Sequence, residues 1–484
     1  MMLTIEYVPS VLVALEAAFP TPPNRAKQQL DKYLLLLERL MRLSLLNRSV
    51  YARRFDAYDI PLTKLINGSP TINNKRYRVH QWLGANGMAL VKNINASANN
   101  ITKEIAILKP TANLIVKNDN LLKYLQTLTT PELDNYLNSL TQDWQDMIAD
   151  YQSHYNSLNV QDRRIQYFTS PVDIPALKRY MTSIVQGATT LNKYQQENSI
   201  VQAEYVLRLA QVNNGLLHQK IDKKAFGRTY YEGVSVLSTR KELRMAFLGS
   251  SWEYDCKSCS TAWKMSFATE WHAQKKSRKL DVRHTFPAMT LYLEDKDSFF
   301  DAVIQEVYNS LSTPEYKATI KEAMTALGFG AKLSMGTWRS DTGEENQSSL
   351  FEVFDRDTVA LKKFVECALV KTFNAEQQTL NKFIAAKFSS DVVWQAEMTA
   401  EQQRKKVKQF SAAQKIVWLY QHAETIMMDT VRAEVKKSGN TVLANVHDAV
   451  VVRNQIPALL LAMIERKVQQ RTGVGYFRLG ETAY

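Results

Sequence analysis

The stretch TVLANVHDAVVVRN, residues 441–454, places a His-Asp pair inside a run that otherwise has the composition of a buried β-strand. Apolar and β-branched residues on both sides of the pair favour a strand in the interior of a sheet. A carboxylate buried there without a partner would be costly. Any fold of this chain therefore has to account for the position of Asp448.

Size and charge limit the classes of protein to consider. The chain has 484 residues, which is too long for one ordinary hydrophobic core, so we expect two or three subdomains that share a cleft. Lys and Arg number 61 against 48 Asp and Glu, a formal net charge of +13. Such an excess of positive charge is typical of proteins with a polyanionic partner, and it favours nucleic acid over an acidic membrane.

The sequence gives no sign of membrane insertion or secretion. Its strongest apolar run, residues 456–468, breaks into charge and is typical of an amphipathic helix, whereas a bilayer span needs roughly 20 apolar residues. The N-terminal stretch carries Glu6 and Glu16 and lacks a basic region, so it does not resemble a signal peptide. We expect a cytoplasmic protein with no membrane partner, in the host cytoplasm if the protein is viral.

The three cysteines do not form a disulfide framework. Cys256 and Cys259 make a lone CxxC, without a second pair or a His at zinc spacing, which argues against a zinc site.

Changes in composition predict three regions. Residues 1–118 combine a basic amphipathic helix within residues 24–55 with a small β-containing module, in which residues 75–94 resemble a hairpin around the sequence GANG. Residues 119–220 show long helical patterns, including SIVQAEYVLRLAQVNNGLLHQ at 199–219, and Thr130-Pro131-Glu132 is typical of a helix start. Residues 221–484 alternate strand candidates, loops rich in Gly, Ser and Arg, and helices.

A second carboxylate, Asp255, ends a short aromatic strand in SSWEYDCKSCSTAWKM, residues 250–265. Each aspartate by itself is equally explained as a turn cap or a solvated acid. Two aspartates at strand ends can also converge, and a carboxylate pair can hold two divalent metals about 4 Å apart for an in-line phosphoryl transfer.

A basic helix lies between the two aspartates in sequence. In residues 312–338, Lys317, Lys321 and Thr325 share a helical face with Gly328 or Phe329. A solvated helix is the simpler interpretation, but the two glycines beside Phe329 cost helix stability without evident structural benefit. Lysines on such a face would neutralise a triphosphate. Upstream, Gly227-Arg228 occupies a predicted turn and Arg244 follows, and arginines in such loops typically bind phosphate or stack on a base.

Four motifs in this order carry a resemblance to a known family. GRxY at 227–230, Asp255 followed by SCS, Lys317 and Lys321 followed by Phe329-Gly330, and His447-Asp448 resemble the polymerase core shared by family A DNA polymerases and bacteriophage-type single-subunit RNA polymerases. The resemblance covers roughly residues 224–484. The spacing of four residues from Lys317 to Lys321 and of eight from Lys321 to Phe329 matches the fingers helix of that superfamily.

The resemblance implies an α+β fold of the right-hand polymerase type, with palm and fingers in residues 221–484 and a thumb from residues 119–220. It implies that Asp255 and Asp448 bind Mg²⁺, that Lys321 steadies the triphosphate, and that Asp448 lies exposed in a strand-turn-strand. The residues implied to bind the nucleotide are Lys317, Lys321, Phe329, Gly330 and Ser260, and those implied to contact nucleic acid are Arg228, Tyr230, Arg244 and His447.

The basic stretch at residues 264–284 lies close to Asp255 in sequence. Lys275 and Lys276 within it could bind template phosphates, and a solvated loop is an equally good interpretation.

Sugar choice is the main point that the resemblance leaves open. Ser260 stands where family A DNA polymerases carry a Glu that closes off space for a ribose 2′-hydroxyl, and Ala449 replaces another Glu. The short distance from Arg228 to Asp255 and the position of Arg244 look more like a DNA polymerase, and both polymerase classes favour Tyr at Phe329. We expect a compact DNA-dependent RNA polymerase, with a family A-like DNA polymerase or a primase-polymerase for phage or plasmid replication as the alternative.

The expected partners are a DNA template, nucleoside triphosphates and an RNA product. Because the chain is shorter than typical phage RNA polymerases, we expect it to use an accessory protein or a single-stranded template. A non-catalytic nucleic-acid-binding subunit would keep the positive charge but would need neither aspartate. A helical virion protein whose motifs arose by chance is a third alternative.

Overall fold

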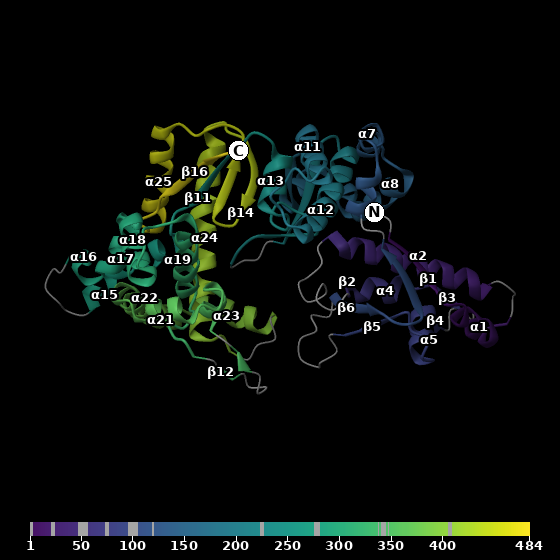
Figure 1. Ribbon diagram of the computed structural model, residues 1–484, viewed down its shortest axis with the longest axis horizontal. Coiled ribbons are helices and arrows are strands. Elements are labelled where there is room, and N and C mark those ends of the chain that lie inside the picture. Colours follow the sequence, from purple (N-terminus) through teal and green to yellow (C-terminus); the bar gives the residue numbers. More distant parts are fainter. Residues whose placement is uncertain are drawn as a thin grey trace. The chain divides into compact units, whose positions relative to one another are not determined.

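A computed structural model of the chain (Figure 1) combines helices and strands, and it describes residues 3–20, 25–46, 57–72, 77–94, 105–118, 121–222, 227–274, 281–336, 338–339, 345–346, 348–404 and 409–484. Contacts along the backbone divide the chain into two compact units. The first unit is Met1–Asp222 with Tyr230–Ser250, and the second is Lys223–Thr229 with Ser251–Tyr484. Residues 230–250, which the sequence assigns to the catalytic core, thus cluster with the first unit.

The first unit combines helices of 5 to 22 residues with small antiparallel sheets. Its helices are α1 (Pro9–Ala18), α2 (Arg25–Leu46), α4 (Leu62–Gly68), α5 (Val79–Ala85), α6 (Leu121–Thr127), α7 (Thr130–Asn138), α8 (Gln142–Tyr151), α9 (Ser153–Ser157), α10 (Val160–Gln166), α11 (Ile174–Val185), α12 (Lys193–Val212) and α13 (Lys241–Leu248). Its strands are β1 (Leu3–Tyr7), β2 (Tyr58–Pro61), β3 (Thr71–Ile72), β4 (Tyr77–Arg78), β5 (Val91–Asn93), β6 (Ile105–Pro110), β7 (Leu114–Asn118), β8 (Tyr167–Pro171), β9 (Leu216–Asp222) and β10 (Tyr230–Glu232). The strands pair as β1-β7, β2-β6-β5, β3-β4 and β10-β9-β8.

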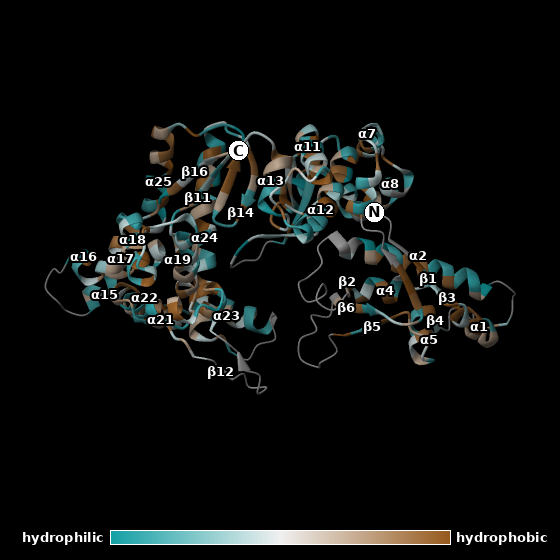
Figure 2. Ribbon diagram, in the orientation of Figure 1, coloured by the Kyte–Doolittle hydropathy of each residue, from teal (hydrophilic) through white to brown (hydrophobic). Residues whose placement is uncertain are grey.

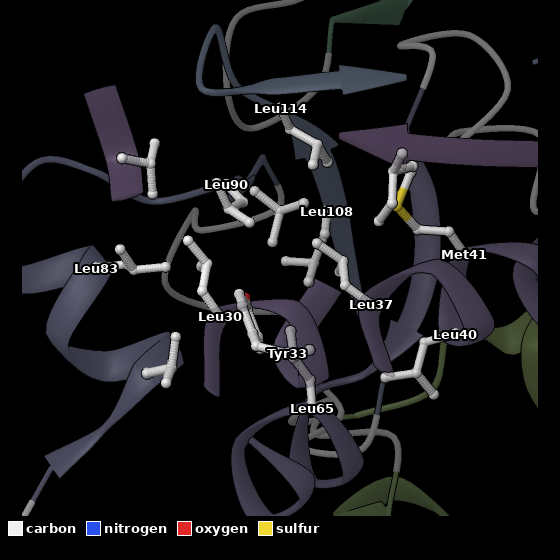
Figure 3. Packing of buried hydrophobic residues seen from close by; sticks show 14 of the residues in the cluster. Leu30, Tyr33, Leu37, Leu40, Met41, Leu65, Leu83, Leu90, Leu108 and Leu114 are labelled. Atoms are coloured by element: carbon white, nitrogen blue, oxygen red, sulfur yellow. The ribbon is translucent and has the colours of Figure 1, made fainter. Parts of the chain in front are cut away.

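The predicted amphipathic helix is α2, and its apolar face forms the core of the N-terminal part of this unit. Leu30, Tyr33 and Leu37 are spaced by three and four residues and are all buried. They pack in one cluster with Leu108 of β6 and Leu114 of β7 (Figure 3). The spacing of apolar residues by three and four therefore predicted helix α2 correctly.

The predicted hairpin around GANG is wrong. Residues Val79–Ala85 form helix α5, and the strands on either side of it pair elsewhere, β4 with β3 and β5 with β6. Val79 and Leu83, four residues apart, are both buried, which is the spacing of one face of a helix. Gly87, with φ of 72°, follows the helix end instead of forming the tip of a hairpin.

The central helices of the first unit largely follow the sequence pattern. Helix α7 begins at Thr130, and the Thr129 amide donates to Glu132 Oε2 at 2.8 Å in a capping box, which confirms the predicted start. The helical pattern expected to continue to residue 219 is wrong at its end. Helix α12 stops at Val212, Asn214 and Gly215 take φ of 53° and 80°, and strand β9 follows. Left-handed residues end a helix because they cannot continue its dihedral angles.

The second unit has a four-stranded antiparallel sheet of order β14-β15-β11-β16, flanked by helices. Its strands are β11 (Trp252–Cys256), β12 (Trp338–Arg339), β13 (Glu345–Asn346), β14 (Val442–Val446), β15 (Ala449–Val452) and β16 (Leu479–Ala483). Its helices are α14 (Cys259–Met265), α15 (Ala268–Gln274), α16 (Val282–Thr285), α17 (Pro287–Glu294), α18 (Lys296–Tyr308), α19 (Pro314–Gly328), α20 (Ser349–Val353), α21 (Thr358–Glu366), α22 (Ala368–Ser389), α23 (Val392–Arg404), α24 (Ala412–Lys437) and α25 (Ala458–Thr472).

The core of this sheet is formed by the apolar run of the opening motif. Val450, Val451 and Val452 of β15 are all fully buried, and the hydrophobic stretches of the sheet are brown in Figure 2. The long helix α24 packs against β14 and β15. Across the described parts of both units, no helix has the length and apolar character needed to cross a bilayer.

Candidate active site

Asp255 lies on β11, and Asp448 lies in the turn that precedes β15, the neighbour of β11 in the four-stranded sheet. Asp255 of β11 is paired with Ala449, the first residue of β15. The amide of Cys256 donates to the carbonyl oxygen of Asp448 at 2.8 Å. Asp448 thus immediately precedes Ala449, the partner of Asp255, and the two carboxylates are close enough for the charge of Asp255 to raise the pKa of Asp448.

Asp448 does not lie in the sheet interior. It is exposed, and with His447 it forms the turn between β14 and β15, where Val446 pairs with Ala449. His447 has φ of 40°, and Ser258, three residues after Asp255, has φ of 48°. Non-glycine residues in this left-handed region are uncommon, and such strain gathers at functional sites. The turn that carries Asp448 and the turn that follows Asp255 therefore both have a strained backbone.

The surroundings of Asp448 disfavour the negative charge of its carboxylate. The pKa of Asp448 is raised, first because its surroundings desolvate the charged form, and then by the negative charges of Glu424 and Asp255, against an opposing contribution from Arg228. A site that disfavours its own negative charge is one that a bound cation would relieve.

Arg228 and Glu424 form an ion pair beside Asp448. Glu424 of α24 is fully buried, and it accepts hydrogen bonds from Arg228 Nη2 at 2.8 Å and from Arg228 Nε. The hydroxyl of Tyr420, one turn earlier, donates to Glu424 Oε1 at 2.6 Å. Thr425 Oγ1 donates to the carbonyl oxygen of Gly227 at 3.0 Å, which fixes the Gly227-Arg228 turn on α24. Arg228 is thereby oriented by three groups of one helix.

The predicted lysines lie on α19. Its buried residues are Ile320, Ala323, Met324 and Leu327, and Lys321 is on the exposed face opposite to them. Lys317 pairs with Asp297 of α18, and this hydrogen bond raises the pKa of Lys317. Of the two ammonium groups, Lys317 is already paired within the protein.

The end of α19 is attached to two other helices of the second unit. The ring of Phe329 is 39 % exposed and lies 5.8 Å from that of Tyr420. Gly330 has φ of 95°, and a Cβ there would approach Ala413 Cβ to 2.6 Å, so both conformation and space require glycine. The fully buried Lys264 of α14 donates to the carbonyl oxygen of Gly328 at 2.8 Å. Burial lowers the pKa of Lys264 to about 7.

The remaining predicted residues lie in different places. Ser260 is half-buried in the first turn of α14, in the second unit. Tyr230 and Arg244 belong to the first unit, where Tyr230 is 37 % exposed on β10. Arg244 is buried, and its Nη1 donates to the carbonyl oxygen of Val236 at 2.9 Å.

Two further lysines were predicted as template contacts. Lys275 and Lys276 lie outside the described residues, so their assignment stays a prediction.

Gly480 leaves room for the carboxylate of Asp255. It lies opposite Asp255 on β16. A Cβ on Gly480 would lie 2.7 Å from Asp255 Oδ1 and 3.1 Å from Cε of Lys257. The side chains of Asp255 and Lys257 therefore run side by side across this glycine.

The donor set fits Mg²⁺. Two adjacent carboxylates offer hard oxygen ligands, and Mg²⁺ is commonly bound by one or two carboxylates together with waters and substrate phosphates. Within the described ranges, no group of three or more His, Cys, Asp or Glu side chains is arranged to hold a metal. Cys256 and Cys259 are buried free thiols.

Sequence reasoning missed Glu424, Lys264 and Gly480, and also Lys296, whose Nζ donates to the Ser258 hydroxyl at 2.8 Å. Glu424 had a weak signal, because Tyr420 and Glu424 are four residues apart on a helix and can face one partner. The sequence carried no such signal for Lys264 or Lys296, because a lysine within an amphipathic pattern is normally solvated.

Comparison with known proteins gives matches among solved structures alone. No protein family and no curated protein matches the sequence. Among solved structures, the POL domain of Pol1 from M. smegmatis, in complex with DNA primer-template and dNTP, is similar with a TM-score of 0.34 and 13 % identity. The match covers 75 % of this chain and 65 % of that domain, so this chain spans about two thirds of its length. A TM-score this low establishes neither fold nor activity.

Proposed function

We propose that the protein is a template-directed nucleotidyltransferase, most specifically a compact DNA-dependent RNA polymerase of the bacteriophage single-subunit type. The observation that carries the proposal is the position of Asp255 on β11 and of Asp448 in the turn before the neighbouring strand β15, at the same end of the sheet. The lysines of α19 supply the positive charge that a triphosphate requires. In this reading β11 and β14–β16 form the palm, α19 belongs to the fingers, and residues 119–220 supply the thumb.

Each group of the site has a role in this reaction. Asp255 and Asp448 would hold Mg²⁺, which when bound supplies electrostatic stabilisation of the attacking and leaving oxygens. Lys321 neutralises charge on the triphosphate, and Phe329 packs near the incoming base. Arg228, oriented by Glu424, and His447 contact the template or the growing strand. The partners are then a DNA template, nucleoside triphosphates and the RNA product, with an accessory protein for template loading.

The test is an extension assay on single-stranded DNA in Mg²⁺, with and without a primer, comparing ribonucleotide and deoxynucleotide mixtures. Ribonucleotide products support a transcriptase or primase. Deoxynucleotide products without ribonucleotide products would assign the protein to replication instead. Binding of the DNA with no product from either mixture would contradict the enzyme proposal and favour a non-catalytic binding subunit.

Gly480→Ala should lower the extension rate about tenfold or more, because the new Cβ displaces the Asp255 carboxylate and small misplacements of reacting groups are costly. The matched control is Gly475→Ala, since a Cβ at Gly475 meets nothing within 4 Å. Single-turnover extension and urea unfolding of both variants would measure the effect. Equal rates for Gly480→Ala and wild type would show that the position of Asp255 does not limit the reaction.

Ser260→Glu should change the sugar preference. A Glu at this half-buried position in the first turn of α14 would fill the space that the proposal assigns to the ribose 2′-hydroxyl. The ratio of ribonucleotide to deoxynucleotide incorporation should fall about tenfold or more, with Ser260→Ala as the control that keeps the space open. An active Ser260→Glu enzyme with an unchanged ratio would remove Ser260 from sugar selection.

A further inference from the structure

Lys296, the first residue of α18, is held in place near the carboxylate pair. Its Nζ donates to the hydroxyl of Ser258 at 2.8 Å. The same ammonium lies 4.8 Å from the ring centroid of Tyr292 and 5.6 Å from that of Phe300. Cation–π contacts and a hydrogen bond together restrict a side chain that would otherwise be free to sample many rotamers. The charge of Lys296 is therefore preorganised at a fixed point.

Ser258 connects this lysine to the candidate active site. It lies in the strained turn after Asp255, between β11 and α14. Its hydroxyl does not cap α14, whose N-terminal residue it precedes. The Ser258 hydroxyl instead contacts Lys296 and the Tyr292 hydroxyl. The position of Lys296 is thus coupled to the turn that follows Asp255.

Three ammonium groups from three elements act on the same region. The pKa of Lys296 is lowered to about 8, first by burial and then by the positive charges of Lys321 on α19 and Lys257 after β11, while Asp255 and Asp297 oppose the shift. Asp297 already pairs with Lys317. Lys257 runs beside Asp255 over Gly480. The ammonium groups of Lys257 and Lys321 disfavour the charge of Lys296, and a polyanion bound among the three would relieve this repulsion.

The chemistry of the cluster selects the class of anion. Lysines are compact point charges that bind phosphate, whereas planar carboxylates are matched better by the fork of an arginine. Three separate ammonium groups fit an anion with several charged groups in a row. A polyphosphate has this form, and a single phosphate does not need three lysines.

We propose that Lys296, with Lys257 and Lys321, binds the polyphosphate of the incoming nucleotide, and that Lys296 is the fixed member of this set. The inference deepens the proposed function and rests on it for the identity of the ligand as a nucleoside triphosphate. Lys296 lies outside the motifs that carried the family resemblance, and Lys257 lies between Asp255 and SCS in one of them without being a residue that the resemblance matched.

The experiment measures binding of inorganic tripolyphosphate to the full-length protein by isothermal titration calorimetry at constant ionic strength. This probe needs neither template nor turnover. Lys296→Met keeps an unbranched side chain of similar length and removes the charge, and should raise the Kd about tenfold or more. Lys296→Arg should recover part of the affinity. The matched control, Lys362→Met on exposed α21, should change the Kd less than about twofold.

A second arm separates a polyphosphate from a nucleic-acid backbone. The same variants are titrated with a single-stranded oligonucleotide, whose binding should not change in Lys296→Met. Loss of oligonucleotide affinity with tripolyphosphate affinity retained would overturn the inference, as would wild-type protein that does not bind tripolyphosphate. Should Lys296→Met fail to fold, acetylation of wild-type lysines read by mass spectrometry replaces it: tripolyphosphate should protect Lys296 and leave Lys362 reactive, and equal protection of both would overturn the inference.

The extension assay keeps this inference distinct from the proposed function. If tripolyphosphate binding depends on Lys296 but the protein has no extension activity, the anion site is supported and the polymerase proposal is wrong. If the protein extends nucleic acid and Lys296→Met changes neither the nucleotide KM nor the tripolyphosphate Kd, the polymerase proposal is supported. Lys296 then does not belong to the polyphosphate site.

Discussion

Asp448→Asn should abolish nucleotide addition, with a loss of about 10³-fold or more in extension rate. The substitution keeps the size of the side chain and its place in the turn, but it removes a charged ligand from the carboxylate pair. Binding of the DNA template should remain close to wild type, because backbone phosphates are contacted by cationic groups. Asp429→Asn is the control, since Asp429 lies exposed on α24 and pairs only with the nearby Arg432 among the contacts described.

The same variant should be more stable than wild type at neutral pH in the absence of divalent metal. The raised pKa of Asp448 means that the folded state binds a proton more tightly than the unfolded state does. As pH rises from the ordinary value of 3.8 through the raised pKa, wild type loses stability, and the loss is complete above the raised pKa. Asparagine does not titrate, so its advantage should be largest at neutral pH and disappear below the ordinary pKa.

Differential scanning fluorimetry across pH, with and without Mg²⁺, would measure both effects. Mg²⁺ should raise the melting temperature of wild type more than that of Asp448→Asn, because a ligand stabilises only the state that binds it. A variant that kept its extension activity would exclude Asp448 as a metal ligand. If Asp448→Asn were less stable than wild type at neutral pH, the positive charge of Arg228 would fully compensate the negative charge of the Asp448 carboxylate.

Glu424→Ala should lower the free energy of unfolding of the second unit by about 2–3 kcal/mol, the largest loss of stability among the proposed variants. The substitution leaves Arg228 without its partner and removes the acceptor of the Tyr420 hydroxyl, while the Glu424 site is fully buried. The Arg228 side chain is 21 % exposed, so water can partly solvate its charge, and we therefore expect a smaller loss than the roughly 3–5 kcal/mol of broken buried pairs. Extension should also fall, because the released guanidinium is free to turn toward Asp448 and compete with the metal.

Urea unfolding of a double-mutant cycle separates these contributions. Glu424→Gln keeps an oxygen acceptor and should lose less stability than Glu424→Ala. Adding Arg228→Met to Glu424→Ala should restore part of the stability, because an apolar pair replaces an unpaired charge. A double variant no more stable than Glu424→Ala would show that the cost comes from the cavity and not from Arg228.

The secondary structure around the candidate site could be predicted from the sequence. The apolar runs on both sides of His447-Asp448 became β14 and β15, and the aromatic run before Asp255 became β11. The lysine spacing placed Lys321 on the exposed face of α19. These features are local, because the period of buried residues reflects which face of a helix or strand meets the core. The hairpin predicted around GANG was wrong for a local reason as well, because glycines near a helix end resemble those of a hairpin turn.

By itself, the sequence determined that this chain carries two carboxylates at strand ends and a lysine face on a helix between them. Only the tertiary structure decided which groups surround those carboxylates. Glu424 meets Arg228 across 196 residues, Lys296 meets Ser258 across 38, and Gly480 faces Asp255 from another strand of the sheet. Such partners are set by packing between distant elements, and a charged residue in a sequence shows no sign of whether it will be solvated or held against another charge.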